Sequence, residues 1–283
     1  MSPQTLNRRF PMALWSKCAR EALPLLIALV ALMLVFNWLI VWLTSLVDIG
    51  ALGTFLQALP KEFEKLAGVP FATAATPTGR IAMAYVDPVV IFSLVAWSIG
   101  RGSDCVSGEL GRGTMEMLLA QPVERSSVVL VQAAVTTAGA AALAAAAWLG
   151  TWLGIQTVQF AAEVRPVLYV PAALNLFAFA FCLAGIATLV SSLDSYRWRT
   201  VGIVAGIYVV QLMFKIVSRI APGFGWLKYA TFLGAFEPQG LVIRPDSAWT
   251  ELVAMNGALL GLGVACYAAA VVVFSRRDLP APL

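Results

Sequence analysis

The stretch Ser107–Arg125, which reads SGELGRGTMEMLLAQPVER, decides how the rest of the chain is organised. It is rich in charged residues and glycines, whereas the rest of the chain is mostly apolar, and long hydrophobic segments flank it on both sides. We therefore expect a loop over 102–126 between two membrane spans. Glycine tolerates backbone conformations that other residues avoid, so Gly108, Gly111 and Gly113 are expected to break any continuous helix here.

A short helix is expected inside this loop. Thr114 is a good N-cap, and Glu116 suits the positive end of a helix. Pro122 would stop the helix, because the residue before a proline avoids the helical region. The helical spacing places three apolar residues on one stripe, namely Met115, Leu118 and Leu119. An isolated helix needs about 12–15 residues in water, so this one must dock against something. Its exposed side would carry mixed charge from Arg112, Glu116, Glu124 and Arg125.

The composition is that of an integral membrane protein. Of the 283 residues, 60% are hydrophobic and only 12% are charged, and the mean hydropathy is +0.84. A soluble domain carries about 25% charged residues. The net charge of +4 is explained by basic residues at the ends of spans, so we expect no nucleic-acid partner.

The sequence predicts an all-α fold with six transmembrane helices in a single transmembrane domain over 1–283. Each hydrophobic stretch is long enough to cross about 30 Å of hydrocarbon. The expected spans are 24–47, 80–101, 127–156, 168–192, 200–218 and 251–274. Three small-residue pairs should let helices approach closely, within the bundle or between two copies: Gly150 and Gly154, Gly202 and Gly206, Gly257 and Gly261.

Two further segments are expected at the membrane surface. Residues 1–22 interleave basic and apolar side chains, which is typical of an interfacial helix; a partly disordered tail is the alternative. Residues 219–250 are aromatic-rich, as at a membrane interface. They form either a re-entrant or interfacial element between the fifth and sixth spans or an ordinary outer loop.

Polar residues inside the spans are the candidates for a translocation path. They are Asn37, Asp87, Asn175 and Gln211. Asp87 precedes Pro88, so the second span is either kinked there or begins there with Asp87 as its cap. In the second case the helix must run past Arg101 to reach full length.

The loop resembles the cytoplasmic loop of the type-2 ABC transporter permeases, in which a short helix after the second span touches the ATPase subunit. The matching residues are Glu109, Gly113, Thr114, Glu116, Leu118, Leu119, Pro122 and Arg125. The resemblance implies that these residues couple the chain to a separate ATPase. It also implies a second permease copy, most simply a homodimer, with membrane lipid around both.

The function implied is that of the membrane subunit of an ATP-driven exporter in a bacterial-type inner (cell) membrane. Multidrug, lipid or peptide export, or the sub-type that serves copper loading of nitrous oxide reductase, are all compatible. Lys and Arg are denser on the loops that would be cytoplasmic, so both termini are expected on that side. No cofactor is expected in this chain, since ATP and Mg would bind the partner.

The chemistry of an enzyme is absent from the sequence. There is no histidine and no GxxxxGK[ST] motif, so the chain has no histidine-based catalytic or metal site and no ordinary ATP-phosphate cradle. We therefore expect the chain not to be an enzyme. The alternative to a permease is a non-transporting membrane scaffold or assembly protein, which would need no ATPase.

Overall fold

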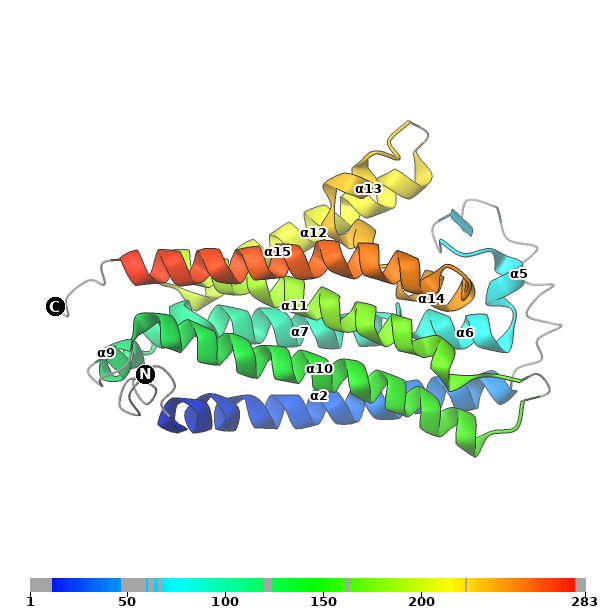
Figure 1. The fold of residues 1–283 in the computed structure, drawn as a ribbon, viewed down its shortest axis with the longest axis horizontal. Coiled ribbons are helices and arrows are strands. Elements are labelled where there is room, and N and C mark those ends of the chain that lie inside the picture. The colour runs from blue at the N-terminus through cyan, green and yellow to red at the C-terminus, as the bar shows by residue number, and fades with distance from the viewer. Residues whose placement is uncertain are drawn as a thin grey trace.

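The fold is a long bundle of helices, seen in a computed structural model (Figure 1). The structure describes residues 12–46, 60, 64–65, 68–119, 124–160, 163–221 and 223–277. Every regular element within those ranges is a helix. Six stretches are long and apolar enough to cross a membrane: Met12–Leu46, Pro77–Gly111, Arg125–Thr157, Pro166–Leu193, Arg197–Ile220 and Ala248–Arg276. The all-helical, multi-pass architecture expected from the sequence is therefore present.

The first span differs from expectation at its start. We expected a separate interfacial helix before residue 24, but α2 runs without interruption over Met12–Leu46, with Pro24 inside it. At 1.5 Å per residue this helix is about 50 Å long, which exceeds a hydrocarbon core of about 30 Å. The basic stretch around Lys17 and Arg20 is therefore an extension of the span itself. Residues 1–11 lie outside the described part of the chain.

The second span is broken where the Asp87–Pro88 pair predicted. Helix α6 (Pro77–Ala84) ends before a turn, and α7 (Pro88–Ser103) begins after it. The Asp87 carboxylate accepts the N–H of Val89 at 2.9 Å, which is an N-cap bond. This confirms the capping alternative and the extension past Arg101 that it required.

The extension is longer than expected. After α7 the chain continues through a π-helical turn, η1 (Asp104–Gly108), into α8 (Glu109–Gly111). The prediction that Gly108 breaks the helix is wrong, since it lies inside this continuous stretch. Residues 102–111, expected as loop, belong to the second long helix. Helices α10 (Arg125–Thr157), α11 (Val170–Leu193, after the 3-10 turn η2, Pro166–Tyr169), α12 (Arg197–Ile220) and α15 (Ala248–Arg276) begin and end near the limits expected for the other spans.

Helix α11 lies at the centre of the bundle, and its partners pack closely around it (Figure 1). Close contact depends on small residues at some crossings. A Cβ added at Gly150 of α10 would lie 2.3 Å from the carbonyl oxygen of Leu34 of α2, and one at Gly154 would lie 2.6 Å from Val41. That small-residue pair therefore packs inside the molecule, between α10 and α2.

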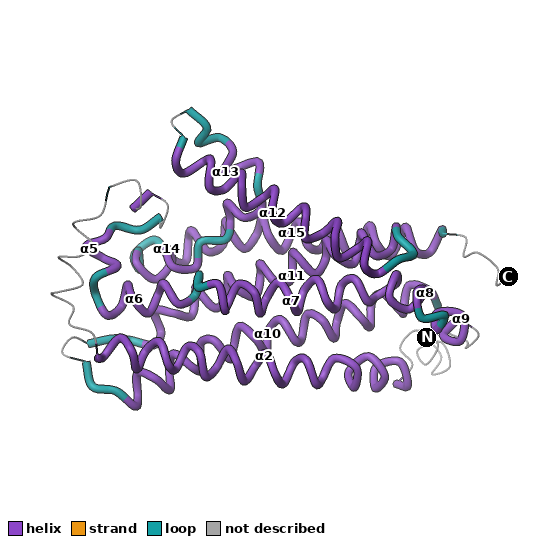
Figure 2. The backbone as a smooth tube through the Cα atoms, turned by 180° about the vertical axis from the view of Figure 1, so that it is seen from behind, coloured by secondary structure: helices purple, strands orange, loops and turns teal. Residues whose placement is uncertain are grey.

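The segment between α12 and α15 forms three short helices. Helix α13 (Leu227–Ala230) has no buried residue and lies away from the bundle, as Figures 1 and 2 show. The 3-10 turn η3 (Phe232–Ala235) and α14 (Pro238–Ile243) instead return into the bundle, where Leu233 and Leu241 are buried. Packing therefore holds the η3–α14 part of this segment to the bundle, and the α13 part is exposed.

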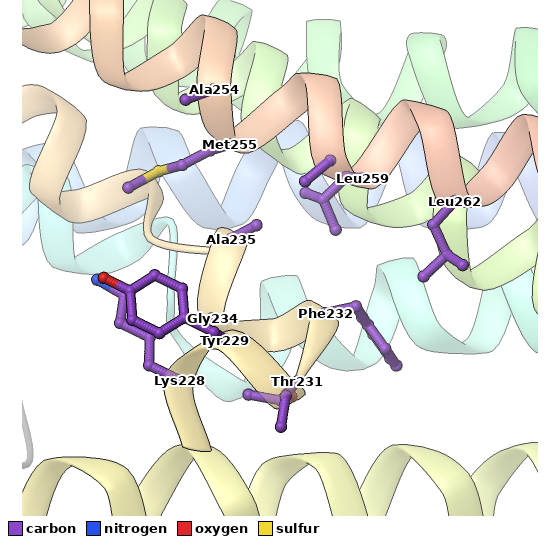
Figure 3. Close-up of a pocket in the computed structure, with 12 residues that line it drawn as sticks. Lys228, Tyr229, Thr231, Phe232, Gly234, Ala235, Ala254, Met255, Leu259 and Leu262 are labelled. Carbon is purple, nitrogen blue, oxygen red and sulfur yellow. The ribbon is translucent and has the colours of Figure 1, made fainter. Parts of the chain in front are cut away.

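Helix α12 diverges from the bundle toward α13 (Figure 1), and a lateral cavity lies between the segment that follows α12 and α15. Only Thr200 and Val204 of this helix are buried. Between η3 and α15 lies an opening of about 490 Å³, lined by residues that include Phe232, Ala235 and Leu259 (Figure 3).

Candidate coupling site

The short helix predicted after the second span exists and lies at one end of the bundle. Helix α9 covers Thr114–Leu119. It lies at the end where α2 begins and α15 ends (Figures 1 and 2). The chain turns between α8 and α9 at Gly113, whose φ of +70° is the left-handed conformation that favours glycine. Gly113 is therefore the glycine that separates the two helices.

The apolar side of α9 packs against this chain itself. Met115 is 1% exposed and Leu118 is partly buried in a cluster that we call the end cluster. Its buried members come from five elements: Leu14, Cys18, Cys105, Val106, Met115, Val128, Val129, Val131, Ala270 and Phe274. Among the described side chains of α9, Met117 is the most exposed, at 73%. Sequence reasoning missed Met117, because the helical spacing identifies a stripe without showing what covers it.

Glu109 joins α9 to the first span. Its buried carboxylate accepts two hydrogen bonds of 2.9 Å from the Nζ of Lys17 on α2 and one of 3.1 Å from Arg112. The Thr114 hydroxyl also donates to this carboxylate and, at 3.2 Å, to the Glu109 carbonyl oxygen. Thr114 is the first residue of α9, one position past the cap that we expected it to be, and its hydroxyl bonds backward to Glu109.

The other residues of the predicted coupling motif have mixed positions. Arg125 begins α10 and donates to the Arg277 carbonyl oxygen at 2.7 Å, so it ties α10 to the end of α15. Glu116 and Leu119 lie on α9, but their side chains are outside the described part of the chain, and so is Pro122 altogether.

A buried carboxylate with three arginines lies beside this site, and the sequence analysis did not single it out. Asp104 of η1 lies 2.7 Å from Arg112, 3.4 Å from Arg197 and 3.9 Å from Arg101. The hydrogen bond to Asp104 is the main reason why the pKa of Arg112 is raised above its usual value. The arginines come from α7, the turn before α9, and α12, so only the tertiary fold could show that they meet.

A hydroxyl network holds the π-helical turn to α11 and α12. The Oγ of Ser191 accepts the N–H groups of Val106 at 3.1 Å and Ser107 at 2.9 Å, and donates to the Ser103 carbonyl at 3.0 Å. Thr200 of α12 donates to the Ser107 hydroxyl at 3.0 Å. Single π turns inside α-helices often occur at functional sites. This one is held to two other spans just before α8 and α9.

The turn between α11 and α12 is also closed by charge. Asp194 accepts Nε of Arg199 at 2.6 Å and the N–H of Tyr196 at 3.0 Å. The hydrogen bond from Arg199, aided by the backbone N–H groups, lowers the pKa of Asp194 to about 2. Arg277 donates to the carbonyls of Ser192 and Asp194 at 2.8 and 2.9 Å, so the end of α15 is held here too.

The four candidate path residues are not brought together by hydrogen bonds within the described residues. Asn37 is buried where α2 meets Gly150, and its amide donates to the Met33 carbonyl. Asn175 donates to Asn256 at 2.8 Å and to the Ala235 carbonyl at 3.0 Å, and accepts the N–H of Glu237. Asp87 caps α7.

The remaining candidate, Gln211, lies on α12, and its buried Oε1 has no hydrogen-bond partner among the described residues. The buried Oδ1 of Asn37 also lacks a hydrogen-bond partner among the described residues, whereas both ends of the Asn175 amide are bonded.

Comparison with protein-family models and with curated proteins finds no match to this chain.

Proposed function

We propose that this chain is the permease subunit of an ABC exporter and that α9 transmits motion from a separate ATPase. The observation that carries the proposal is the two-sided position of α9. Met115 is buried against the bundle, and Met117 on the same helix is exposed. The resemblance of the surrounding motif to type-2 permeases and the six long apolar helices support the same conclusion.

The contacts of α9 suit the transmission of force. The end cluster joins it to α2, η1, α10 and α15, and the Glu109–Lys17 pair adds a polar link to α2. Interiors are close-packed, so they transmit a displacement rather than absorb it. A push on α9 would therefore move several spans together. In this proposal the ATPase lies in the cytoplasm below α9 and holds ATP and Mg.

Two copies of the chain would enclose the path. Helices α12 and α15 carry two of the small-residue pairs, and a Cβ added at Gly202, Gly206, Gly257 or Gly261 would meet nothing within 4 Å. These faces are therefore open to a second copy, unlike Gly150 and Gly154. We assign η3 and α14 as the re-entrant element between the fifth and sixth spans, since they return into the bundle.

The test is co-purification of the chain with the ATPase encoded by a neighbouring reading frame that carries Walker motifs. The variant is Met117→Asp, which changes an exposed side chain and leaves the end cluster intact. Burying a methionine side chain contributes about 1.5–3 kcal/mol, so its replacement should weaken ATPase binding by at least about tenfold. ATP hydrolysis stimulated by the permease should fall with it.

The matched control is Met12→Asp, at the same end of the bundle and 86% exposed, but on α2 rather than α9. It should bind the ATPase as the unaltered chain does. Equal binding by all three proteins would refute the role of α9. The absence of any bound ATPase, with a well-folded permease, would favour the scaffold alternative.

A further inference from the structure

A charged cavity opens on the side of the bundle close to its α9 end. It has a volume of about 410 Å³ and lies between α2, α7 and α12. Its lining consists of Glu21, Leu25, Gly100, Arg101, Asp104, Arg112 and Arg197. Arg112 is shared with the candidate coupling site, where it donates to Asp104 and Glu109.

The cavity has an excess of positive charge. Three arginines line it, against the carboxylates of Asp104 and Glu21. Glu21 also lies 3.8 Å from Lys17, which offsets part of its charge. Glu109 also accepts from Arg112 and Lys17. The three carboxylates therefore face four cations, the three arginines and Lys17, so neutralisation is incomplete by one positive charge. An anion with several acceptor oxygens would complete it, as guanidinium groups bind phosphate well.

Arg101 is the deepest of the three arginines and is under-satisfied. It is 5% exposed, and its Nε has no hydrogen-bond partner among the described residues. Its terminal nitrogens make only long contacts, 3.4 Å to the Cys18 carbonyl and 3.9 Å to Asp104. A buried charged group with spare donors is costly unless something accepts from it.

The position of the cavity fits the boundary between lipid and water. Leu25, which lines it, is 40% exposed, and the same face of α2 continues two turns later with the exposed apolar side chain of Leu32. On the other side, Trp198 of α12 is 85% exposed next to Arg197. Tryptophan is enriched at membrane interfaces. The cavity thus lies where an apolar helical surface gives way to charge, at the depth of lipid headgroups.

We propose that this cavity binds the phosphate of an anionic phospholipid, held by Arg101 and Arg197 with the acyl chains along the apolar surface of α2. Basic pockets between membrane helices are suited to anionic headgroups. A zwitterionic lipid would be disfavoured because its ammonium group adds positive charge beside the arginines. The inference does not depend on the proposed transport function, since it concerns the bundle and its lipid alone.

Native mass spectrometry of the full chain in detergent tests this, with phosphatidylglycerol and phosphatidylcholine as probes. The unaltered chain should retain phosphatidylglycerol more strongly than phosphatidylcholine. Arg197→Gln should weaken that retention about fivefold, the effect of about 1 kcal/mol for one arginine near a membrane surface. Arg101→Gln should weaken it at least as much. The matched control is Arg165→Gln, an exposed arginine paired with Glu163 outside the cavity, which should change nothing.

Three results would overturn the proposal. They are equal retention of the two lipids, no loss on Arg197→Gln, or the same loss on Arg165→Gln. Arg197 is 44% exposed in its side chain, so its replacement tests the site even if Arg101→Gln fails to fold. Glycerol phosphate distinguishes the source of the phosphate. It should displace bound phosphatidylglycerol only weakly, and displacement at equal concentration would identify a soluble phosphate as the ligand.

Discussion

The change Ser191→Ala should separate the π-helical turn from the core of the bundle. The Ser191 hydroxyl is the acceptor for the buried N–H groups of Val106 and Ser107, and both bonds would be lost at once. The π-helical turn places these donors against α11, where the residues around them are buried. Water could therefore not easily replace the hydroxyl.

The expected cost follows from the two donors left unpaired. A buried donor without a partner costs about 1–3 kcal/mol, so the free energy of unfolding should fall by about 2–4 kcal/mol after partial relaxation. The matched control is Ser192→Ala, the next residue on the same helix and also buried. Its hydroxyl donates only to the Leu189 carbonyl within its own helix. That change should cost about 0.6 kcal/mol or less.

Reversible unfolding of the purified chain in mixed detergent and SDS micelles measures both values. Hydrogen exchange would locate the effect, since the amides of Val106 and Ser107 should exchange faster in Ser191→Ala alone. If Ser191→Ala and Ser192→Ala lower the free energy of unfolding equally, the hydroxyl is not an essential acceptor and the reasoning fails.

Two other predictions concern packing and pH. Gly150→Ala should lower the thermal stability of the chain in detergent markedly, because its Cβ would lie 2.3 Å from the Leu34 carbonyl. The helical control Gly100→Ala should be tolerated, because nothing lies within 4 Å of its added Cβ. Equal melting temperatures of the two variants would contradict this. The pKa of Asp194 is lowered to about 2 by Arg199, so its stabilising effect is complete above the unfolded pKa of about 3.9 and is lost as the pH falls toward 2. Thermal melting between pH 2 and 6 should show this loss in the unaltered chain and a flatter curve in Asp194→Asn; identical curves would count against it.

The sequence was sufficient to predict the helices, because hydrophobic length alone identifies a membrane span. It also identified the cap at Asp87, since an aspartate before a proline has a local mechanism that needs no tertiary contact. Local rules failed at Gly108. A glycine inside a helix costs about 1 kcal/mol, and here the bonds of Ser191 to the preceding residues hold the chain helical despite it.

The residues around α9 could be predicted only in part, for a similar reason. The spacing gave the apolar stripe of Met115 and Leu118, but the surface that covers it comes from α2, α10 and α15. Threonine is a residue type favoured at N-caps, which is why Thr114 was predicted to be one. Its hydroxyl instead bonds to Glu109, whose position depends on Lys17. Contacts between residues far apart in the sequence decide which surface covers an apolar stripe and which partner a hydroxyl takes. Sequence patterns alone do not show these contacts.

The packing of α9 against its own bundle strengthens the case for coupling. A short helix that touched only a partner would move with that partner and leave the spans in place. Met115 in the end cluster and Glu109 on Lys17 instead make α9 part of the same close-packed body as α2, α10 and α15. Close-packed contacts shift between discrete arrangements rather than yield gradually. In the proposed function, a load applied at Met117 would therefore pass to three spans, which a flexible loop of identical composition could not transmit.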